Sequence, residues 1–411
     1  MNASRSYSLA LFDYPLHWIV SSYNLVLYTG DLDYLRQYYP VLVKTLDSFY
    51  TSVTNQDTSL VFKGLSGTGS YGDYAFLPRN GSITYYNAMY VLALNQAAEL
   101  ADALSKSSDA SRWRSRASTV AASLLKNNWD PKVGAFFDGG PCPGYSSDAL
   151  CPTHSQDGNS IAILSGVTAS NGSDSSVSES ILSYLADATS QPHGNAFFDN
   201  DLLLTPSQQT NPYSRFSTRV YAFISFFELS ARFASTSAGT VASGFDQLRR
   251  TYGWMASRDP GGTFWEGAGP DGQPYETAYT SMAHGWSSGV TPLLTRYVLG
   301  VAPAGPGFGR WTLKPVKAGS GGVAWAKGVV PTPKGPITVG WEDGDGGYRM
   351  SVKAPEGTTG EVSVPVDDKR AKVSLDGKVV YDGGSGDSGA VYKHEYVVFE
   401  VSGGEHTITV G

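Results

Sequence analysis

The residues best suited to chemistry lie about two thirds of the way along the chain. Glu266 follows Trp265 between two glycine-rich bends. His284 lies 18 residues later, and Trp286 follows two positions after it. A carboxylate against an aromatic face holds a proton more readily than one in water, and sugar rings stack on aromatic faces. Glycoside cleavage needs one carboxyl group that protonates the leaving oxygen and a second that activates water or attacks. This stretch therefore indicates acid–base chemistry on a carbohydrate.

Other common catalytic patterns are missing from the sequence. It has no CxxC and His spacing for zinc, no G-x-G-x-x-G motif behind a strand, no P-loop lysine and no G-x-S-x-G elbow. We therefore expect no metal ion and no cofactor. Carboxylates and aromatic rings in long loops remain as candidates. The loop residues in question are Asp13, Tyr14, Trp18, Tyr71, Asp73, Tyr74, Asp157, Asn159, Trp265, Glu266, His284 and Trp286.

Composition points to a polar, uncharged ligand. The 411 residues are enough for two domains, only 16% of them are charged, and there are 25 tyrosines and 9 tryptophans. A net charge of −7 argues against a nucleic-acid partner or an anionic membrane surface. No run of 18 apolar residues is present that would span a membrane. We expect a secreted protein, although the first residues lack the features of a signal peptide.

The two cysteines lie in one irregular loop. Cys142 and Cys151 stand nine positions apart between prolines, and a local disulfide is favoured over two free thiols. Asn2, Asn80 and Asn171 begin Asn-x-Ser triplets, which would suit glycosylation in a eukaryotic secretory route.

The first 300 residues show helical periodicity. Apolar residues recur every three or four positions in nine segments, which are joined alternately by short turns and by long loops rich in Gly, Tyr and Asp. Such hairpins predict an (α/α)6 toroid whose long loops gather at one mouth. An ordinary bundle stays open as an alternative, whereas a solenoid would show a fixed repeat length. The helical segments fall at Leu16–Leu27, Leu32–Val53, Tyr86–Leu104, Trp113–Leu124, two within 156–190, and one each within 215–235, 238–257 and 290–297.

The pattern changes at Val301–Gly307, a run rich in proline and glycine. Beyond it apolar residues alternate with period two in about eight short segments, and Asp376-Gly377 marks a two-residue hairpin turn. We predict a helical domain over 1–302 and a C-terminal β-sandwich over 303–411.

The whole chain resembles the C-terminal two thirds of glycoside hydrolase family 78 proteins, the α-L-rhamnosidases. Residues 7–300 resemble the (α/α)6 barrel of that family and 305–411 its C-terminal β-sandwich. The order of the matching motifs carries the resemblance, since each is weak alone. The motifs are YTGDLDYL at Tyr28–Leu35, YGDY at Tyr71–Tyr74, QDGNSIA at Gln156–Ala162, TFWE at Thr263–Glu266, AHGW at Ala283–Trp286 and GFGRWTLKP at Gly307–Pro315.

The resemblance implies an inverting hydrolase that releases terminal α-L-rhamnose, with Glu266 as the general base. It also implies a set of residues that bind the sugar. Tyr74 stands where the family has a tryptophan after the Gly-Asp pair, which leaves its stacking role in question. The implied sugar-binding residues are Asp13, Trp18, Asp73, Tyr74, Trp265, His284 and Trp286.

The same resemblance places the general acid in a segment that precedes Met1. The helical domain is accordingly expected to be N-terminally incomplete, with nine helices in place of twelve. Loss of a general acid typically lowers the rate by roughly a hundred- to ten-thousandfold. An opened toroid would expose apolar helix flanks, which invite a partner or a homo-oligomer.

Three other functions stay open beside hydrolysis of rhamnosides. The chain could be a non-catalytic glycan-binding or scaffold protein that keeps the aromatic residues without an acid. It could be a barrel repurposed for a biosynthetic pathway, with Asp13 or Asp73 as the acid. It could also be a different (α/α)6 glycosidase, such as a trehalase-like enzyme or a glucuronyl hydrolase.

Overall fold

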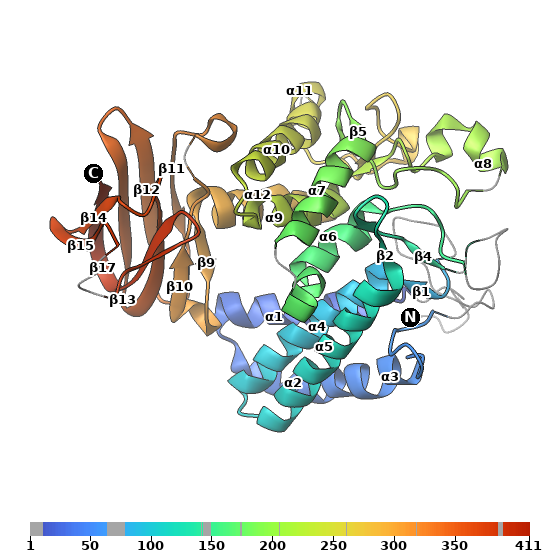
Figure 1. Ribbon diagram of the computed structural model, residues 1–411, viewed down its shortest axis with the longest axis horizontal. Helices are drawn as coiled ribbons and strands as arrows, with labels where there is room; N and C mark the ends of the chain where they lie inside the picture. Colours follow the sequence, from blue (N-terminus) through green and yellow to red (C-terminus); the bar gives the residue numbers. More distant parts are fainter. Residues whose placement is uncertain are drawn as a thin grey trace. The chain divides into compact units, whose positions relative to one another are not determined.

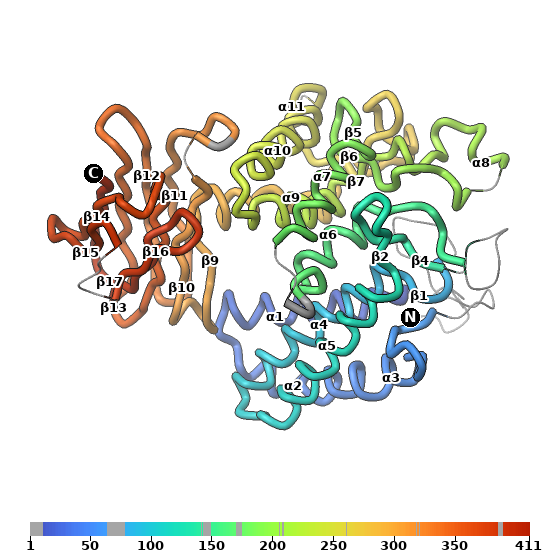
Figure 2. Tube along the Cα trace, in the orientation of Figure 1, coloured from blue at the N-terminus to red at the C-terminus, as the bar shows by residue number. Residues whose placement is uncertain are grey.

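The chain divides into two compact units in a computed structural model. The first unit comprises residues 1–23, 33–231 and 247–288, and the second comprises 24–32, 232–246 and 289–411. Figures 1 and 2 show helices along the first part of the chain and strands after residue 300. The structure describes residues 11–63, 79–140, 142, 149–172, 175–204, 206–259, 261–317, 319–384 and 389–411.

Long helices build most of the first part of the chain, as the periodicity predicted. Two of them continue through π-helical turns, at Thr45–Phe49 and Arg249–Gly253, so that single periodic segments of the sequence become several short elements. Pro40 lies inside α2 without ending it. The helices are α1 (Tyr14–Thr29), α2 (Leu32–Lys44), α3 (Tyr50–Ser52), α4 (Thr84–Ala103), α5 (Ser107–Asn128), α6 (Gln156–Leu164), α7 (Ser176–Ala188), α8 (Pro206–Thr210), α9 (Ala222–Ala234), α10 (Ala238–Leu248), α11 (Trp254–Arg258) and α12 (Val290–Leu293).

Successive helices differ in how much of their surface is buried. In α4 all of residues 84–91 are buried, whereas α5 buries only one stripe, which includes Trp113, Ala117, Val120 and Leu124. The pair α6 and α7 repeats this difference. A helix buried all round lies inside, and one with a single apolar stripe covers it from outside. This alternation of inner and outer helices is what the predicted toroid of helical hairpins requires.

Short β-ribbons hold the long loops at the beginnings of the buried helices. β1 (Ser82–Ile83) pairs with β4 (Gly139–Gly140) and runs directly into α4. β7 (Val220–Tyr221) pairs with β8 (Gly267–Ala268) and runs directly into α9. Two further ribbons join β2 (Trp129–Asp130) to β3 (Ala135–Phe136) and β5 (Ser190–Gln191) to β6 (Gly194–Asn195). The ribbons thus bring loop residues to the N-terminal ends of helices.

The strands after residue 300 form one hydrogen-bonded sheet. Two glycine-rich interruptions that indicated turns, near Gly357 and Gly403, lie within single long strands, because the pairing continues across a register shift between Ala354 and Thr359. Asp376 and Gly377 have φ values of 52° and 79°, as a two-residue hairpin turn requires. The strands are β9 (Val301–Pro303), β10 (Arg310–Leu313), β11 (Trp325–Val330), β12 (Ile337–Gly344), β13 (Gly347–Pro365), β14 (Lys372–Leu375), β15 (Lys378–Asp382), β16 (Val391–Lys393) and β17 (Tyr396–Val410).

One apolar core fills the inside of this sheet. Trp311, Trp341, Val362 and Phe399 belong to a single cluster of buried side chains, as the two facing layers of the predicted β-sandwich require, and a C-terminal β-sheet domain is confirmed. Residues 289–302, which the sequence places in the helical domain, group with the sheet. The physical tie is local, since the Trp341 indole N–H donates to the carbonyl oxygen of Val298 at 2.9 Å.

Candidate active site

A ribbon and a hydrogen-bonded loop hold Glu266 beside the first turn of α9. Glu266 directly precedes β8, in which Gly267 pairs with Tyr221. A Cβ atom at Gly267 would lie 3.1 Å from the Tyr221 ring and 3.2 Å from the Tyr275 ring. The missing side chain at this position therefore lets both tyrosines close on the residue next to Glu266.

Two neutral donors orient the Glu266 carboxylate. The Tyr275 hydroxyl donates to Oε1 at 3.0 Å, and the backbone N–H of Ser281 donates to Oε2 at 3.0 Å. The backbone N–H of Glu266 donates in turn to the Ser281 carbonyl oxygen at 2.8 Å. Burial, followed by the nearby charges, raises the pKa of Tyr275 above its ordinary value, so its hydroxyl stays a donor. The carboxylate is thus held in place while its side chain keeps 18% of its surface exposed.

His284 and Trp286 lie next to that carboxylate. Nδ1 of His284 is 4.0 Å from Oε2 of Glu266, and its side chain is 29% exposed. The His284 and Trp286 rings are 4.4 Å apart between centroids, and the Trp286 indole N–H donates to the Glu266 carbonyl oxygen at 3.4 Å. The structure therefore brings together the three residues that the sequence associated in the motifs TFWE and AHGW.

Trp265 supports this loop from inside. Its side chain is only 3% exposed, and its indole N–H donates to Asp259 at 3.3 Å. Its carbonyl oxygen accepts a hydrogen bond from the Ser287 hydroxyl at 2.8 Å. The sequence predicted sugar binding for Trp265. The ring packs inside the protein instead, and Trp286 is the partly exposed tryptophan of the pair.

A series of rings continues from Trp286 to the start of α1. Trp286 stacks on Phe223 at 5.4 Å and 23°, and Phe223 lies 5.7 Å from the ring of His17. Nε2 of His17 is 2.9 Å from the Tyr85 hydroxyl, which donates to Asp13 at 2.7 Å. Phe223, Tyr85 and His17 belong to the first turns of α9, α4 and α1. The long-loop ends of three helices therefore converge on one polar and aromatic group.

Burial changes the proton affinity at the far end of this series. Asp13 is 1% exposed, and its desolvation raises the pKa of its carboxyl to about 6 against the opposing hydrogen bond from Tyr85. Desolvation lowers the pKa of His17 to about 4. Both groups are therefore driven towards their neutral forms, as expected where burial penalises the charged form.

This arrangement can bind and activate a small polar ligand. A held carboxylate with an open side can accept a proton from water, and partly exposed rings of Trp286 and Phe223 offer faces on which a sugar can stack. His284 adds a ring nitrogen within reach of the same space.

Comparison with known sequences separates this chain from other helical hairpin proteins. The family described as the bacterial α-L-rhamnosidase six-hairpin glycosidase domain matches residues 12–193, and the one described as the bacterial α-L-rhamnosidase C-terminal domain matches residues 300–378. The chain belongs to the α-L-rhamnosidase family, glycoside hydrolase family 78.

Similar rhamnosidases are much longer than this chain. An α-L-rhamnosidase of Streptomyces avermitilis is 26% identical over 167 residues, which cover 39% of this chain and 15% of that protein. The structure of α-L-rhamnosidase from Dictyoglumus thermophilum matches with a TM-score of 0.66 and 18% identity, over 96% of this chain and 39% of that one. The Streptomyces avermitilis enzyme complexed with L-rhamnose matches with a TM-score of 0.62 and 17% identity, over 94% and 32%.

The remaining residues that the rhamnosidase resemblance assigned to sugar binding are Trp18, Asp73 and Tyr74. Trp18 packs its ring on Tyr38 of α2 at 6.5 Å, whereas its neighbour His17 faces Phe223 and Tyr85. Asp73 and Tyr74 lie outside the described residues.

A buried ion-pair group adjoins the ring series in this rhamnosidase-family unit, with the Arg79 guanidinium carbon 5.4 Å from the centre of the Tyr85 ring. Arg79 forms paired hydrogen bonds with Asp157, at 2.7 and 2.9 Å, and further ones with Asp138. The side chains of Arg79, Asp138 and Asp157 are 0%, 3% and 0% exposed. The electrostatic effect of Arg79 reaches Asp13, whose pKa it lowers, although less strongly than burial raises it. Asp157, which the sequence suggested as a candidate site residue, therefore forms a buried ion pair with Arg79.

Several members of the site went unnoticed in the sequence. Tyr275 occurs in a loop without periodicity, and Phe223 and His17 look like ordinary residues of apolar helices. Only position in the chain could have pointed to Phe223 and His17, because both fall near the first turn of helices that follow long loops. In a hairpin toroid, the helix ends at that mouth are the places to search.

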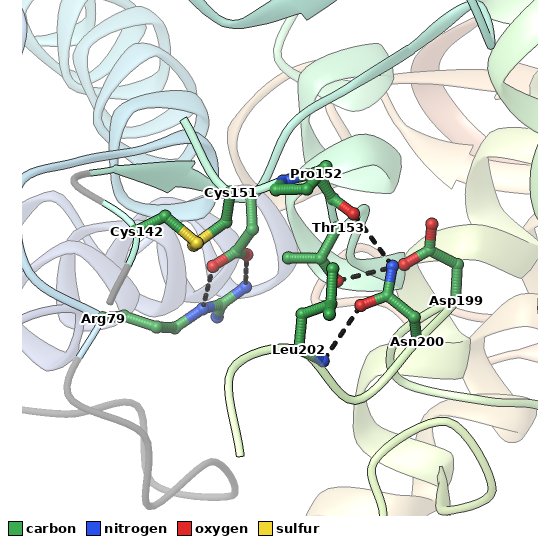
Figure 3. Close-up of a disulfide and its surroundings, with 9 residues drawn as sticks. Arg79, Cys142, Cys151, Pro152, Thr153, Asp199, Asn200 and Leu202 are labelled. Carbon is green, nitrogen blue, oxygen red and sulfur yellow. Dashed lines mark hydrogen bonds and ion pairs between the residues drawn. A yellow bond between two sulfur atoms is a disulfide. The ribbon is translucent and has the colours of Figure 1, made fainter. Parts of the chain in front are cut away.

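The two cysteines are joined, as the sequence favoured. Figure 3 shows the disulfide between Cys142 and Cys151 with Arg79 beside it. The backbone N–H of Cys151 donates to the Gly139 carbonyl at 2.9 Å, and that of Asp138 donates to Thr153 at 2.8 Å. The bridge therefore closes the loop that positions Asp138 for Arg79.

Among the residues that the structure describes, no group of three or more His, Cys, Asp or Glu side chains is arranged to hold a metal ion. None of their helices is both long and apolar enough to cross a membrane.

Proposed function

We propose that this chain acts on terminal α-L-rhamnosides and that Glu266 is the general base of an inverting hydrolysis. The observation that carries the proposal is the fixed but partly open carboxylate beside His284 and Trp286. Membership of a rhamnosidase family supports the choice of sugar, as does the similarity to an enzyme complexed with L-rhamnose.

In the proposed reaction Glu266 removes a proton from a water molecule that attacks the anomeric carbon. The bond to the leaving oxygen breaks on the opposite face, so the released sugar has inverted configuration. Tyr275 and the Ser281 N–H hold the carboxylate at the angle that this attack requires, and Trp286 supports the ring of the sugar. His284 is placed to hydrogen-bond a sugar hydroxyl.

The dependence of the rate on the leaving group tests the base separately from the acid. Dinitrophenolate leaves without being protonated, so 2,4-dinitrophenyl α-L-rhamnoside needs only the base. We expect turnover of this substrate to fall by roughly a hundred- to ten-thousandfold in Glu266→Gln. Product configuration, followed by proton NMR of the first-formed rhamnose, should show inversion.

The matched control is Glu276→Gln, on the same loop and similarly half-buried. This variant should keep the wild-type rate. Equal losses of rate in the two variants would contradict the assignment of Glu266 as the general base. Absence of turnover together with rhamnose binding that survives Glu266→Gln would favour the alternative of a non-catalytic glycan-binding protein.

A slow reaction on alkyl rhamnosides beside a fast one on the dinitrophenyl compound would mean that no general acid serves the site. Comparable rates on both would mean that an acid is present, and Asp13→Asn would then show whether that buried carboxyl supplies the proton.

A further inference from the structure

The C-terminal sheet carries an exposed tryptophan on its outer face. In β11 buried or half-buried residues alternate with exposed ones, so Trp325, Lys327 and Val329 all point away from the core. Trp325 and Val329 are each 61% exposed. β11 stands at the end of the strand order, and a tryptophan this exposed on it buries little apolar surface in the folded protein.

The strand register places hydrogen-bonding groups beside Trp325, on the side of β12. Trp325 pairs with Glu342 of β12, Glu342 with Arg349 of β13, and Arg349 with Thr409 of β17. Residues directly opposite on neighbouring strands share a face. A row of side chains therefore crosses four strands, over about 14 Å at the usual spacing of strands.

A second row runs beside the first and contains a gap. It places Lys327 opposite Gly340, Gly340 opposite Ser351, and Ser351 opposite Thr407. A Cβ atom at Gly340 would lie 3.4 Å from the Ser351 hydroxyl oxygen and 3.9 Å from Cβ of Lys327. The missing side chain therefore leaves a depression in the middle of the face.

These two rows line a shallow hollow of about 610 Å³. Its size falls in the range of small-molecule sites, about 300–1,000 Å³. The lining residues are Trp325, Lys327, Gly340, Glu342, Arg349, Ser351 and Thr407, together with the edges of Ala326 and Trp341.

The charged groups of the hollow are available to a ligand. Among the described residues neither Glu342 nor Arg349 forms a side-chain hydrogen bond or an ion pair, although they stand directly opposite one another. The next pair on this face, Lys353 and Glu405, does form an ion pair at 3.3 Å. The Lys327 ammonium lies 5.9 Å from the centre of the Trp325 ring, the outer limit of a cation–π contact.

We propose that this face is a second, non-catalytic binding site for a neutral oligosaccharide. The C–H face of one pyranose ring stacks on Trp325. Glu342, Arg349 and Ser351 exchange hydrogen bonds with the hydroxyl groups of that ring and of the next along the row. The open hollow admits a chain of sugars from the side, so it suits a polysaccharide better than an isolated monosaccharide.

The composition of the face favours this ligand over other partners. Trp325 and Val329 are its exposed apolar side chains, which is too little for the apolar centre that protein interfaces usually have. Glu342 stands directly opposite Trp325, and the hollow as a whole holds one acidic and two basic side chains, Glu342, Lys327 and Arg349. A neutral sugar can hydrogen-bond to both kinds of side chain without placing a charge of its own beside either.

Affinity electrophoresis of the full chain tests the proposal. The protein is run through gels that contain a soluble arabinogalactan, galactomannan or xyloglucan, with polygalacturonate as the acidic comparison. We expect retardation by at least one neutral polysaccharide, and Trp325→Ala should weaken that binding about tenfold or more. Val329→Ala, equally exposed on the same strand, should change it by less than about twofold.

A Trp286→Ala variant separates this site from the proposed catalytic one. Retardation should persist in Trp286→Ala and disappear in the double variant with Trp325→Ala, whether or not the chain hydrolyses rhamnosides. Lack of retardation by every neutral polysaccharide would overturn the proposal, as would equal retardation of wild type and Trp325→Ala. A wild-type dimer that Trp325→Ala converts to a monomer in size-exclusion chromatography would also overturn it, in favour of a protein contact.

Discussion

Two groups of carboxylates in the helical part of this protein have opposite surroundings. Glu266 is held by neutral donors and keeps 18% of its side chain exposed, whereas Asp138 and Asp157 are fully engaged by Arg79 and 3% or less exposed. Both groups adjoin the same series of rings. A buried carboxylate such as Asp157 can therefore have a purely structural role, whereas the partly exposed carboxylate of Glu266 can still accept a proton.

The comparison predicts that the Arg79 group controls stability and the Glu266 group controls activity. Removal of one partner from a buried ion pair leaves an uncompensated charge, whereas removal of a partly exposed carboxylate does not. Asp13 lies between the two cases, since it is buried like Asp157 but joined to the ring series through Tyr85.

The largest effect is expected for Arg79→Met. This change leaves Asp138 and Asp157 buried without their cation, and should lower the free energy of unfolding by about 3–5 kcal/mol. The midpoint of urea unfolding, followed by tryptophan fluorescence, measures it. Arg114→Ala removes an ion pair whose arginine is 48% exposed and should cost less than about 1 kcal/mol. Similar midpoints for the two variants would contradict the structural role given to Arg79.

The next effect concerns the pH dependence of stability, because burial shifts the pKa values of Asp13 and His17 in opposite directions. The raised pKa of Asp13, about 6, makes the folded protein bind a proton that the unfolded chain releases near pH 4, so its contribution to stability is present at low pH and is lost as the pH rises to about 6. The lowered pKa of His17, about 4, acts in reverse: its contribution is present above about pH 6.5 and is lost as the pH falls to about 4.

Single substitutions should separate these two contributions. Asp13→Asn leaves the His17 contribution alone, so unfolding midpoints should rise more steeply from pH 4.5 to pH 6.5 than in wild type. His17→Gln leaves the Asp13 contribution alone, and its midpoints should fall over the same interval. The difference between the variants should reach about 3 kcal/mol, and identical pH profiles would show that neither residue titrates as the burial implies.

The smallest effect is expected for Tyr275→Phe. Loss of one hydrogen bond should cost about 1 kcal/mol of stability. The activity on dinitrophenyl rhamnoside should fall about tenfold through kcat, with KM nearly unchanged, because Tyr275 orients Glu266 and does not contact the sugar in the proposed reaction. A rise in KM alone would instead place Tyr275 in sugar binding.

Much of the fold followed from periodicity. Repeats of three and four residues located the helices, and alternation located the strands, because one face of each element must be buried. The period-two alternation breaks near Gly357 and Gly403, inside β13 and β17, and only pairing with the neighbouring strand shows that each strand continues there. The predicted helix within 215–235 begins at Ala222, after a β-ribbon whose two-residue strands leave no sequence pattern.

Less of the candidate site could be read in this way. That Glu266, His284 and Trp286 lie together could be predicted, because their two motifs are close in the chain. Trp265 was assigned to sugar binding because a sequence does not show which of two tryptophans faces inward. The sequence did not single out His17, which contacts Tyr85, whereas its neighbour Trp18 packs against Tyr38, since one residue along a helix turns a side chain by about 100°.

The amino-acid sequence alone predicted the helical hairpins, the C-terminal β-domain and Glu266 as the candidate base. Those features depend on local periodicity and on neighbours in the chain. Only the tertiary structure decided that Tyr275 and Ser281 hold Glu266, that Asp157 is taken up by Arg79, and that Trp325 stands exposed over Gly340. These relations join residues far apart in the chain, where burial and strand register set which side chains meet.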